Sequence, residues 1–282
     1  MEVLVVGATG RQGGAVAREL GSCGHAVRAF TRHPDSDAAR ELAAAGMRVH
    51  AGDLRDADSV ARAAKGADAV FLMADFRAGP GEEVRAGSCA LEGLRAAGVG
   101  HVVYSSVASA DRRTGIPHFE SKRWIEELLR RSGLPHTVVA PVFFMDNPKP
   151  SLAATGGTVL AMPLAETTVL QQVAVRDIGA FVRHVLEHPD EVVGERIEIA
   201  GDALTGPQAA AVLSCVTGRP VRYQAIPACP DRFGPDIAAM FAWLDRVGYQ
   251  VDIPALHARF PGIGWHTFEA WARDGGVIPG SA

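Results

Sequence analysis

A glycine-rich turn near the start of the chain constrains the fold more than any other feature of the sequence. The run Val3-Leu4-Val5-Val6 is apolar and rich in β-branched residues, which is typical of a strand buried on both faces. It leads into Gly7-Ala8-Thr9-Gly10-Arg11-Gln12-Gly13-Gly14, and a helical pattern follows over 11–22. Glycines at this spacing let the backbone turn tightly and approach a phosphate, to which the helix N-terminus offers free N–H groups. The turn therefore predicts a dinucleotide site, with an ordinary tight turn as the alternative.

Short apolar runs and helical stretches then alternate as far as Ala140. The expected strands cover 26–30, 47–50, 69–73, 101–104 and 137–140, and the expected helices cover 37–45, 56–65, 82–97 and 118–132. Strands and helices in strict alternation are typical of a parallel sheet with helices on both faces. We therefore predict an α/β fold with a doubly wound parallel sheet.

The rhythm changes after Pro141. Residues 145–172 contain several prolines and glycines and predict loops with short strands, whereas 176–187 predicts a helix and 196–199 a strand. Further helices are expected over 206–216, 235–247 and 266–273. We predict a nucleotide-binding domain over 1–145 and a smaller α/β lobe for substrate or partner over 146–282, with the chain crossing back to the sheet around 170–200.

Composition excludes several classes of protein. The chain has 28 Lys and Arg against 32 Asp and Glu, a formal net charge of −4, and a general nucleic-acid binder needs a concentrated basic face instead. The four cysteines include no Cys-x-x-Cys pair, which argues against a zinc knuckle or a disulfide framework. We find no signal-peptide pattern, no apolar run long enough for a bilayer and no metal-ligand cluster. We expect a reduced, cytoplasmic protein that binds neither membrane nor metal.

The end of the second expected strand bears on the choice of cofactor. NAD-preferring folds place a carboxylate there, whereas an arginine suits the 2′-phosphate of NADP. Here the strand ends in Phe30-Thr31-Arg32. Arg32 can pair with a phosphate through its planar fork, or it can be a solvated arginine next to the diluting charges of Asp35 and Asp37. We favour NADP(H) over NAD(H).

The ends of the third and fourth strands supply further candidates. Asp53, with Leu54 beside it, can contact the adenine, and the alternative role for Asp53 is to cap the next helix. The segment Met73-Ala74-Asp75 should pass over the cofactor near the point where the strand order reverses.

At these residues the chain resembles the NmrA-like family of atypical short-chain dehydrogenases/reductases, and especially its HSCARG-like, redox-sensor branch. The resemblance covers nearly the whole chain. It is carried by the glycine turn, Thr31-Arg32-His33-Pro34, Gly52-Asp53, Val102-Val103-Tyr104-Ser105-Ser106, His118-Phe119-Glu120-Ser121-Lys122, Pro141-Val142-Phe143-Phe144, Val175-Arg176-Asp177-Ile178-Gly179 and the segment from Trp265 to Trp271.

The resemblance implies a Rossmann domain and a role for each matching residue. The pyrophosphate ligands would be Gly7, Thr9, Gly10, Arg11, Gln12 and Gly13, and we count Ala8 in the same turn with them. Arg32 would hold the 2′-phosphate and Lys122 the nicotinamide ribose, while Pro141, Val142 and Phe144 would line the nicotinamide side. The HSCARG-like branch carries a second basic residue shortly after the arginine, and Asp35-Ser36-Asp37 offers none.

The catalytic pair of typical reductases in this family, Tyr-x-x-x-Lys, is missing. The lysines are Lys65, Lys122 and Lys149, and the residues four positions before them are Ala61, His118 and Met145. His118 and Lys122 share a helix face, so His118 is a candidate proton donor, with plain packing or capping as the alternative. Ser105 and Ser106 can orient a carbonyl oxygen or bond the turn.

Two functions follow from these residues. Phe76, Phe143, Met145, Phe233 and Met240 are candidates for an apolar pocket beside the nicotinamide, although core packing is the usual fate of such side chains. The first hypothesis, which uses such a pocket, is an NADPH-dependent reductase of a small apolar quinone, enone or carbonyl compound. The alternative is a non-catalytic NADP(H)-sensing regulator acting through a protein partner. A second copy of the chain is also a candidate partner, and 107–117 is a candidate lid.

Overall fold

The computed structural model describes residues 1–148, 152 and 155–276. The chain forms two compact units, Met1–Ala140 with Ile178–Glu198, and Pro141–Asp177 with Ile199–Ala282. The first unit therefore ends at Ala140, where we expected residue 145. The segment that returns to it, Ile178–Glu198, falls within the range 170–200.

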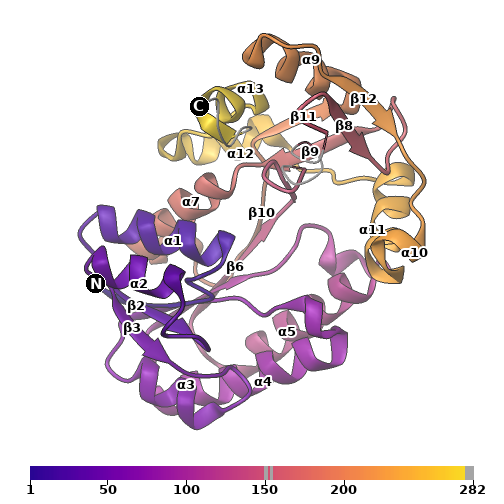
Figure 1. The fold of residues 1–282 in the computed structure, drawn as a ribbon. Coiled ribbons are helices and arrows are strands. Elements are labelled where there is room, and N and C mark those ends of the chain that lie inside the picture. The colour runs from indigo at the N-terminus through magenta and orange to yellow at the C-terminus, as the bar shows by residue number, and fades with distance from the viewer. Residues whose placement is uncertain (149–151, 153–154, 277–282) are drawn as a thin grey trace. The chain divides into compact units, whose positions relative to one another are not determined.

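A seven-stranded sheet forms the centre of the first unit (Figure 1). Its strands are β1 (Glu2–Val6), β2 (Ala26–Thr31), β3 (Arg48–Ala51), β4 (Ala69–Leu72), β5 (His101–Ser105), β6 (His136–Pro141) and β10 (Arg196–Ile199), in the order β10-β6-β5-β4-β1-β2-β3. The pairs from β6 to β3 are all parallel. The strand order reverses between β1 and β4, which places the switch point of the sheet beside the glycine turn.

Helices cover both faces of this sheet, as the alternation predicted. They are α1 (Arg11–Ser22), α2 (Asp37–Ala44), α3 (Ala57–Ala64), α4 (Pro80–Ala97), α5 (Pro117–Ser132), α7 (Val175–Glu187) and the short α8 (Pro189–Val192), with 3-10 turns η1 (Phe76–Ala78) and η2 (Ala110–Arg112). Figure 1 shows α3, α4 and α5 in one layer and α1, α2 and α7 in the other. Ordinary local signals set their ends, since Ser36 caps α2, Asp56 caps α3, and Gly98 and Gly133 close α4 and α5 in the left-handed region.

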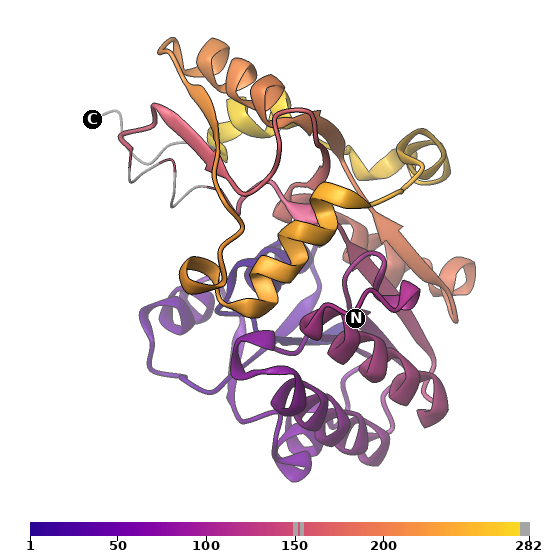
Figure 2. The same ribbon diagram turned by 90° about the vertical axis from the view of Figure 1, so that its right-hand side faces the viewer.

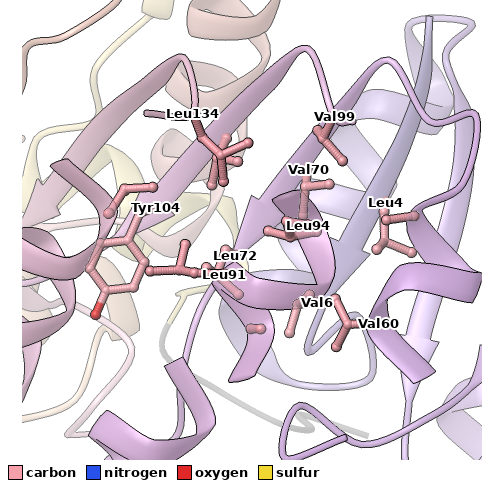
Figure 3. Packing of buried hydrophobic residues seen from close by; sticks show 14 of the residues in the cluster. Leu4, Val6, Val60, Val70, Leu72, Leu91, Leu94, Val99, Tyr104 and Leu134 are labelled. Carbon is pink, nitrogen blue, oxygen red and sulfur yellow. The ribbon is translucent and has the colours of Figure 1, made fainter. Parts of the chain in front are cut away.

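The core beneath α3, α4 and α5 joins side chains from five strands, and Figure 3 shows part of it. Leu4, Val70 and Tyr104 from the sheet meet Val60 of α3 and Leu94 of α4, and all five are almost completely buried. Helices α3 and α4 approach so closely that a Cβ added at Gly93 would lie 2.4 Å from the carbonyl oxygen of Ala57. The sheet edge that carries the candidate site thus rests on a tightly packed layer.

The second unit contains two small sheets. One has the order β11-β9-β7, from β7 (Phe143–Phe144), β9 (Val169–Val173) and β11 (Asp202–Thr205), and the other pairs β8 (Val159–Met162) with β12 (Arg222–Ala225). Its helices are α9 (Gly206–Thr217), α10 (Pro230–Phe233), α11 (Pro235–Arg246), α12 (Ile253–Arg259) and α13 (Phe268–Trp271). The 3-10 turn η3 (Pro261–Ile263) lies between α12 and α13, and a π-helical turn over Ala272–Gly276 follows α13. In Figure 2, α10 leads directly into α11, drawn in orange. The expected helix over 266–273 is wrong in its bounds, because α13 covers only Phe268–Trp271 and continues into the π-helical turn.

Two further properties concern the whole described chain. None of its helices combines the length and the apolar character that crossing a bilayer requires. The four cysteines all carry free thiols.

Candidate functional site

The glycine turn closes tightly between β1 and α1. Gly7 adopts φ +70°, a region that favours glycine, and its carbonyl oxygen accepts a hydrogen bond from the N–H of Gly10 at 2.8 Å. A Cβ at Gly13 would lie 2.3 Å from that same oxygen, so the turn needs glycine there. Gly10 is the N-cap of α1 and supplies no side-chain cap, and the first turn of the helix carries no acid. The N-terminal N–H groups are therefore not satisfied by a side-chain cap or an acid, and can meet an anion.

Gln12 and Ser105 form a buried pair. The side-chain amide of Gln12 donates to Ser105 Oγ at 2.6 Å, and both residues are buried. We expected different tasks for the two residues, pyrophosphate binding for Gln12 and catalysis for Ser105. The structure brings them together and ties α1 to the end of β5. The contact leaves the hydroxyl proton of Ser105 available for another acceptor.

Two Asp-x-Arg turns follow β3 and β4. Asp53 binds the guanidinium of Arg55, with Arg55 Nη2 at 2.5 Å, and Asp75 binds that of Arg77, with Arg77 Nη2 at 2.8 Å. The hydrogen bonds from Arg55 are the main cause that lowers the pKa of Asp53 to about 2, and those from Arg77 lower the pKa of Asp75. The charge of Arg32 lowers both pKa values further. Asp53 and Asp75 are thus each already paired with an arginine of their own.

The capping role considered for Asp53 belongs to another residue. The carboxylate of Asp56 accepts the N–H of Ser59 at 3.1 Å and caps α3, so the capping alternative for Asp53 is wrong. Leu54 packs against the core of the first unit. Met73 lies over the glycine turn, because its sulfur would be 3.0 Å from a Cβ at Gly7.

Lys122 is held by the carboxylate of Glu83, a residue that the sequence alone did not single out. Lys122 Nζ lies 2.7 Å from Glu83 Oε1 and 3.5 Å from the carbonyl oxygen of Ala74, and Ser121 Oγ donates to the other oxygen of Glu83. Glu83 is only 1% exposed. It stands in the first turn of α4 next to the exposed Glu82, so it resembled an ordinary solvated acid. The sequence does hold one signal for the burial of Glu83. Glu83 precedes Gly87, a buried residue of α4, by one helical turn, and this spacing places Glu83 on the inward face of the helix.

His118 is a packed histidine beside a predicted pocket residue. It is 6% exposed, and its ring centroid lies 4.9 Å from that of Phe76 and 4.8 Å from that of Phe119. The segment after β4, which contains Ala74 and Phe76, therefore meets the start of α5, which contains His118 and Lys122. The packing contact is present, and proton donation by His118 stays a prediction.

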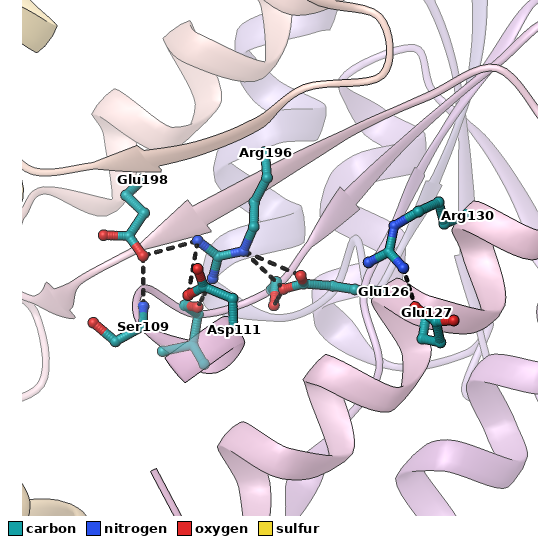
Figure 4. A network of polar contacts seen from close by, with 9 residues as sticks. Ser109, Asp111, Glu126, Glu127, Arg130, Arg196 and Glu198 are labelled. Atoms are coloured by element: carbon teal, nitrogen blue, oxygen red, sulfur yellow. Dashed lines mark hydrogen bonds and ion pairs between the residues drawn. The ribbon is translucent and has the colours of Figure 1, made fainter. Parts of the chain in front are cut away.

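A second buried network fixes the loop after β5 (Figure 4). Ser106 donates to Glu126, and Arg196 Nε lies 3.1 Å from Glu126 Oε2. Burial raises the pKa of Glu126, and the positive charge of Arg196 opposes that rise. Arg196 also donates to the carbonyl oxygen of Val107 at 2.9 Å, and the N–H of Ser109 donates to Glu198 at 2.6 Å. These contacts anchor the first part of the loop that we expected to act as a lid.

Tyr104 does not replace the missing catalytic tyrosine. It is completely buried, and its hydroxyl has no hydrogen-bond partner among the described residues. Burial is the main cause that raises its pKa well above the usual value, and the charges of Glu83 and Glu126 add to the effect. Tyr104 is therefore a neutral core residue.

The predicted pocket residues are divided between the two units. Phe76 belongs to the first, whereas Phe143, Met145, Phe233 and Met240 belong to the second. Within the second unit, the Phe143 and Phe233 rings lie 6.0 and 5.9 Å from the ring of Phe241. Met145 is fully buried and Met240 nearly so. Pro141 ends β6, Val142 lies between β6 and β7, and Phe144 belongs to β7. Their contact with a cofactor or substrate stays a prediction.

The histidines provide no metal site in the described part of the chain. The rings of His184 and His188 stack with centroids 4.5 Å apart. The described residues contain no group of three or more His, Cys, Asp or Glu side chains placed to hold an ion.

The sequence of the chain matches a known protein family and an enzyme of a bacterium. The NmrA-like family matches residues 1–272. An NAD(P)H azoreductase of Xenophilus azovorans is 33% identical over 229 residues, which cover 79% of this chain and 77% of that protein.

Two solved structures show the same fold. An NADPH-dependent quinone oxidoreductase of Escherichia coli, solved with NADPH, has a TM-score of 0.82 at 23% identity, over 97% of this chain and 99% of that chain. NmrA, a negative transcriptional regulator solved with NAD, has a TM-score of 0.81 at 23% identity, over 97% and 94%. These likenesses confirm the α/β Rossmann-type fold.

Proposed function

Because the chain belongs to the NmrA-like family, we propose that it is an NADP(H)-dependent reductase of a small apolar quinone, enone or carbonyl compound. The observation that carries this proposal is the uncapped α1 N-terminus behind the glycine turn, on the sheet edge where Lys122 is held beside Ala74. Family membership itself implies an NAD(P)-binding Rossmann-fold oxidoreductase. The two named relatives, an azoreductase and a quinone oxidoreductase, support a reductase.

The residues present fit a dinucleotide. The turn is closed so tightly that a Cβ at Gly13 would lie 2.3 Å from the carbonyl oxygen of Gly7, and α1 offers N–H groups to a pyrophosphate at this turn. When bound, the cofactor supplies the hydride, while the protein supplies binding and orientation. Lys122 has three N–H donors, of which Glu83 and Ala74 take two, so one remains for a ribose hydroxyl.

NADP(H) is the proposed form of the cofactor. Arg32 is exposed, and among the described residues it takes part in no ion pair. Asp53 and Asp75, which would otherwise repel a 2′-phosphate, are paired with Arg55 and Arg77. A guanidinium with no carboxylate partner is well suited to a phosphate.

Two side chains are proposed to act on the substrate. Ser105 accepts from Gln12 and can donate its own proton to a carbonyl or quinone oxygen. His118, against Phe76, is the proposed proton donor. Phe76, Phe143, Phe233 and Met240 are proposed to supply apolar contacts.

Turnover of NADPH tests the reductase directly. We predict that the purified protein oxidises NADPH with members of a panel of quinones, enones and azo compounds, and that Lys122→Ala lowers kcat/KM at least tenfold, because it removes a charged hydrogen bond worth about 1.5–3 kcal/mol. Absorbance at 340 nm gives the rate. A panel that produces no oxidation above the blank would rule this function out.

A cofactor-sensing regulator, as in the HSCARG-like branch, is the second candidate. It is favoured by the missing tyrosine four residues before Lys122, and by the fold shared with the regulator NmrA. Such a protein would bind a protein partner differently with and without NADPH. Specific turnover that Lys122→Ala abolishes would speak for the reductase instead.

A further inference from the structure

We propose that Glu83 is a positioning residue, which acts through Lys122 to set the affinity of the site for the nicotinamide cofactor. This inference rests on the proposed function and concerns the same site. It starts from a carboxylate that is almost completely inaccessible to water, which is rare for a glutamate.

The partners of Glu83 all come from one turn of α5. Its Oε1 receives Lys122 Nζ at 2.7 Å, and its Oε2 receives the hydroxyl of Ser121. Ser121 Oγ also lies 3.1 Å from the carbonyl oxygen of His118, so the whole contact is local to the start of the helix. A buried carboxylate is costly unless it is paired and hydrogen-bonded, and both of its oxygens are occupied here.

The pairing fixes where the ammonium lies. A lysine side chain is long and flexible, and an unpaired ammonium would turn toward water. Glu83 holds Nζ within 3.5 Å of the carbonyl oxygen of Ala74, in the segment that follows β4 at the carboxyl edge of the sheet. That edge is where dinucleotides bind in open α/β sheets. Without Glu83, Lys122 keeps its charge but loses its fixed position.

A merely structural role makes a different prediction from a positioning role. If Glu83 only neutralised Lys122 inside the fold, Glu83→Gln would change stability and leave the affinity of the folded protein for NADPH intact. If Glu83 positions Lys122, the same substitution weakens NADPH binding, and it has no further effect once Lys122 has been removed.

A double-mutant cycle with the full chain separates these cases. Glu83→Gln, Lys122→Met and the double variant are compared with the wild type by calorimetric titration of NADPH, with thermal unfolding recorded for each. Glu82→Gln is the matched control, since Glu82 is the preceding residue of α4 and pairs on the surface with Arg85. The double variant carries no unpaired buried charge, so it remains informative if Lys122→Met alone does not fold.

We expect Glu83→Gln to weaken NADPH binding at least threefold and the double variant to bind no more weakly than Lys122→Met. Where Lys122→Met does not fold, the double variant should bind more weakly than Glu83→Gln. Glu82→Gln should match the wild type. Unchanged affinity in Glu83→Gln, or losses that simply add in the double variant, would overturn the inference. A wild type that binds no NADPH would instead refute the proposed function, and this inference with it.

Discussion

Charged side chains at the candidate cofactor edge come with partners of opposite sign. Asp53 pairs with Arg55 and Asp75 with Arg77, and among the described residues Arg32 is left without an ion pair. Exposed pairs of this kind contribute little to stability, because water and salt screen them. Their effect on the binding of a phosphate is larger than their effect on stability, because the arginines offset the repulsion that the two carboxylates would exert on it. Arg32 is therefore the residue on which selectivity depends.

Substitution of Arg32 tests that selectivity. Arg32→Glu replaces the phosphate partner with a repelling charge, and we expect NADPH affinity to fall by about 10- to 150-fold, the equivalent of about 1.5–3 kcal/mol for a charged hydrogen bond. NADH, which lacks the 2′-phosphate, should lose less than about threefold. Calorimetric titration with both cofactors measures the ratio. Equal losses for NADH and NADPH would show that Arg32 does not contact the phosphate.

At this scale, the sequence singles out Arg32 by its position after a strand, and the family resemblance singles out Lys122. The contact of both residues with a cofactor stays a prediction. Glu83 and the bond between Gln12 and Ser105 were not found, because each joins residues far apart in the sequence. Glu83 also looked like an ordinary first-turn acid of a helix, a position where acids are favoured in any case.

At the scale of elements, the close approach of α3 and α4 supports the strands that carry the site. Gly93 lets the two helices meet, and the neighbouring core includes Val60 and Leu94. Interiors packed to this density have no slack for an extra methyl group against a backbone oxygen.

Substitution of Gly93 tests that packing. Gly93→Ala places a Cβ 2.4 Å from the carbonyl oxygen of Ala57, and we expect a loss of about 1–3 kcal/mol in the free energy of unfolding. The better helix propensity of alanine, about 1 kcal/mol, offsets part of it. Gly81→Ala in the same helix is the control, since nothing lies within 4 Å of a Cβ there. Denaturant unfolding followed by circular dichroism measures both, and equal stabilities would contradict the packing described.

The strands of the central sheet and the long helices around it were predictable because they are continuous patterns, and several of the helices begin at a cap or end at a glycine. The short α8 was not predicted. The second unit was harder. The strands β11 and β12 are short and contain polar residues such as Asp202 and Gln224, and they are strands because of their pairing with β9 and β8. The helix α12 was also missed, since Pro254 stands inside its first turn and resembles a connection.

At the scale of the whole molecule, the two units are built by different rules. The first follows the alternation of a doubly wound sheet, and the second is a set of small sheets and helices with long-range pairing. Membership of the NmrA-like family covers both units, since the match runs over residues 1–272. The substrate is the property of the molecule that the sequence defines least, because the pocket candidates come from both units.

The central claim is that a dinucleotide binds where β1 turns into α1, and a crystal structure grown with saturating NADPH tests it most directly. We predict pyrophosphate oxygens within hydrogen-bond distance of the backbone N–H groups of Arg11 and Gln12, with the guanidinium of Arg32 on the 2′-phosphate. A turn that stays empty at saturating NADPH, in a crystal whose packing leaves it open, would contradict the claim.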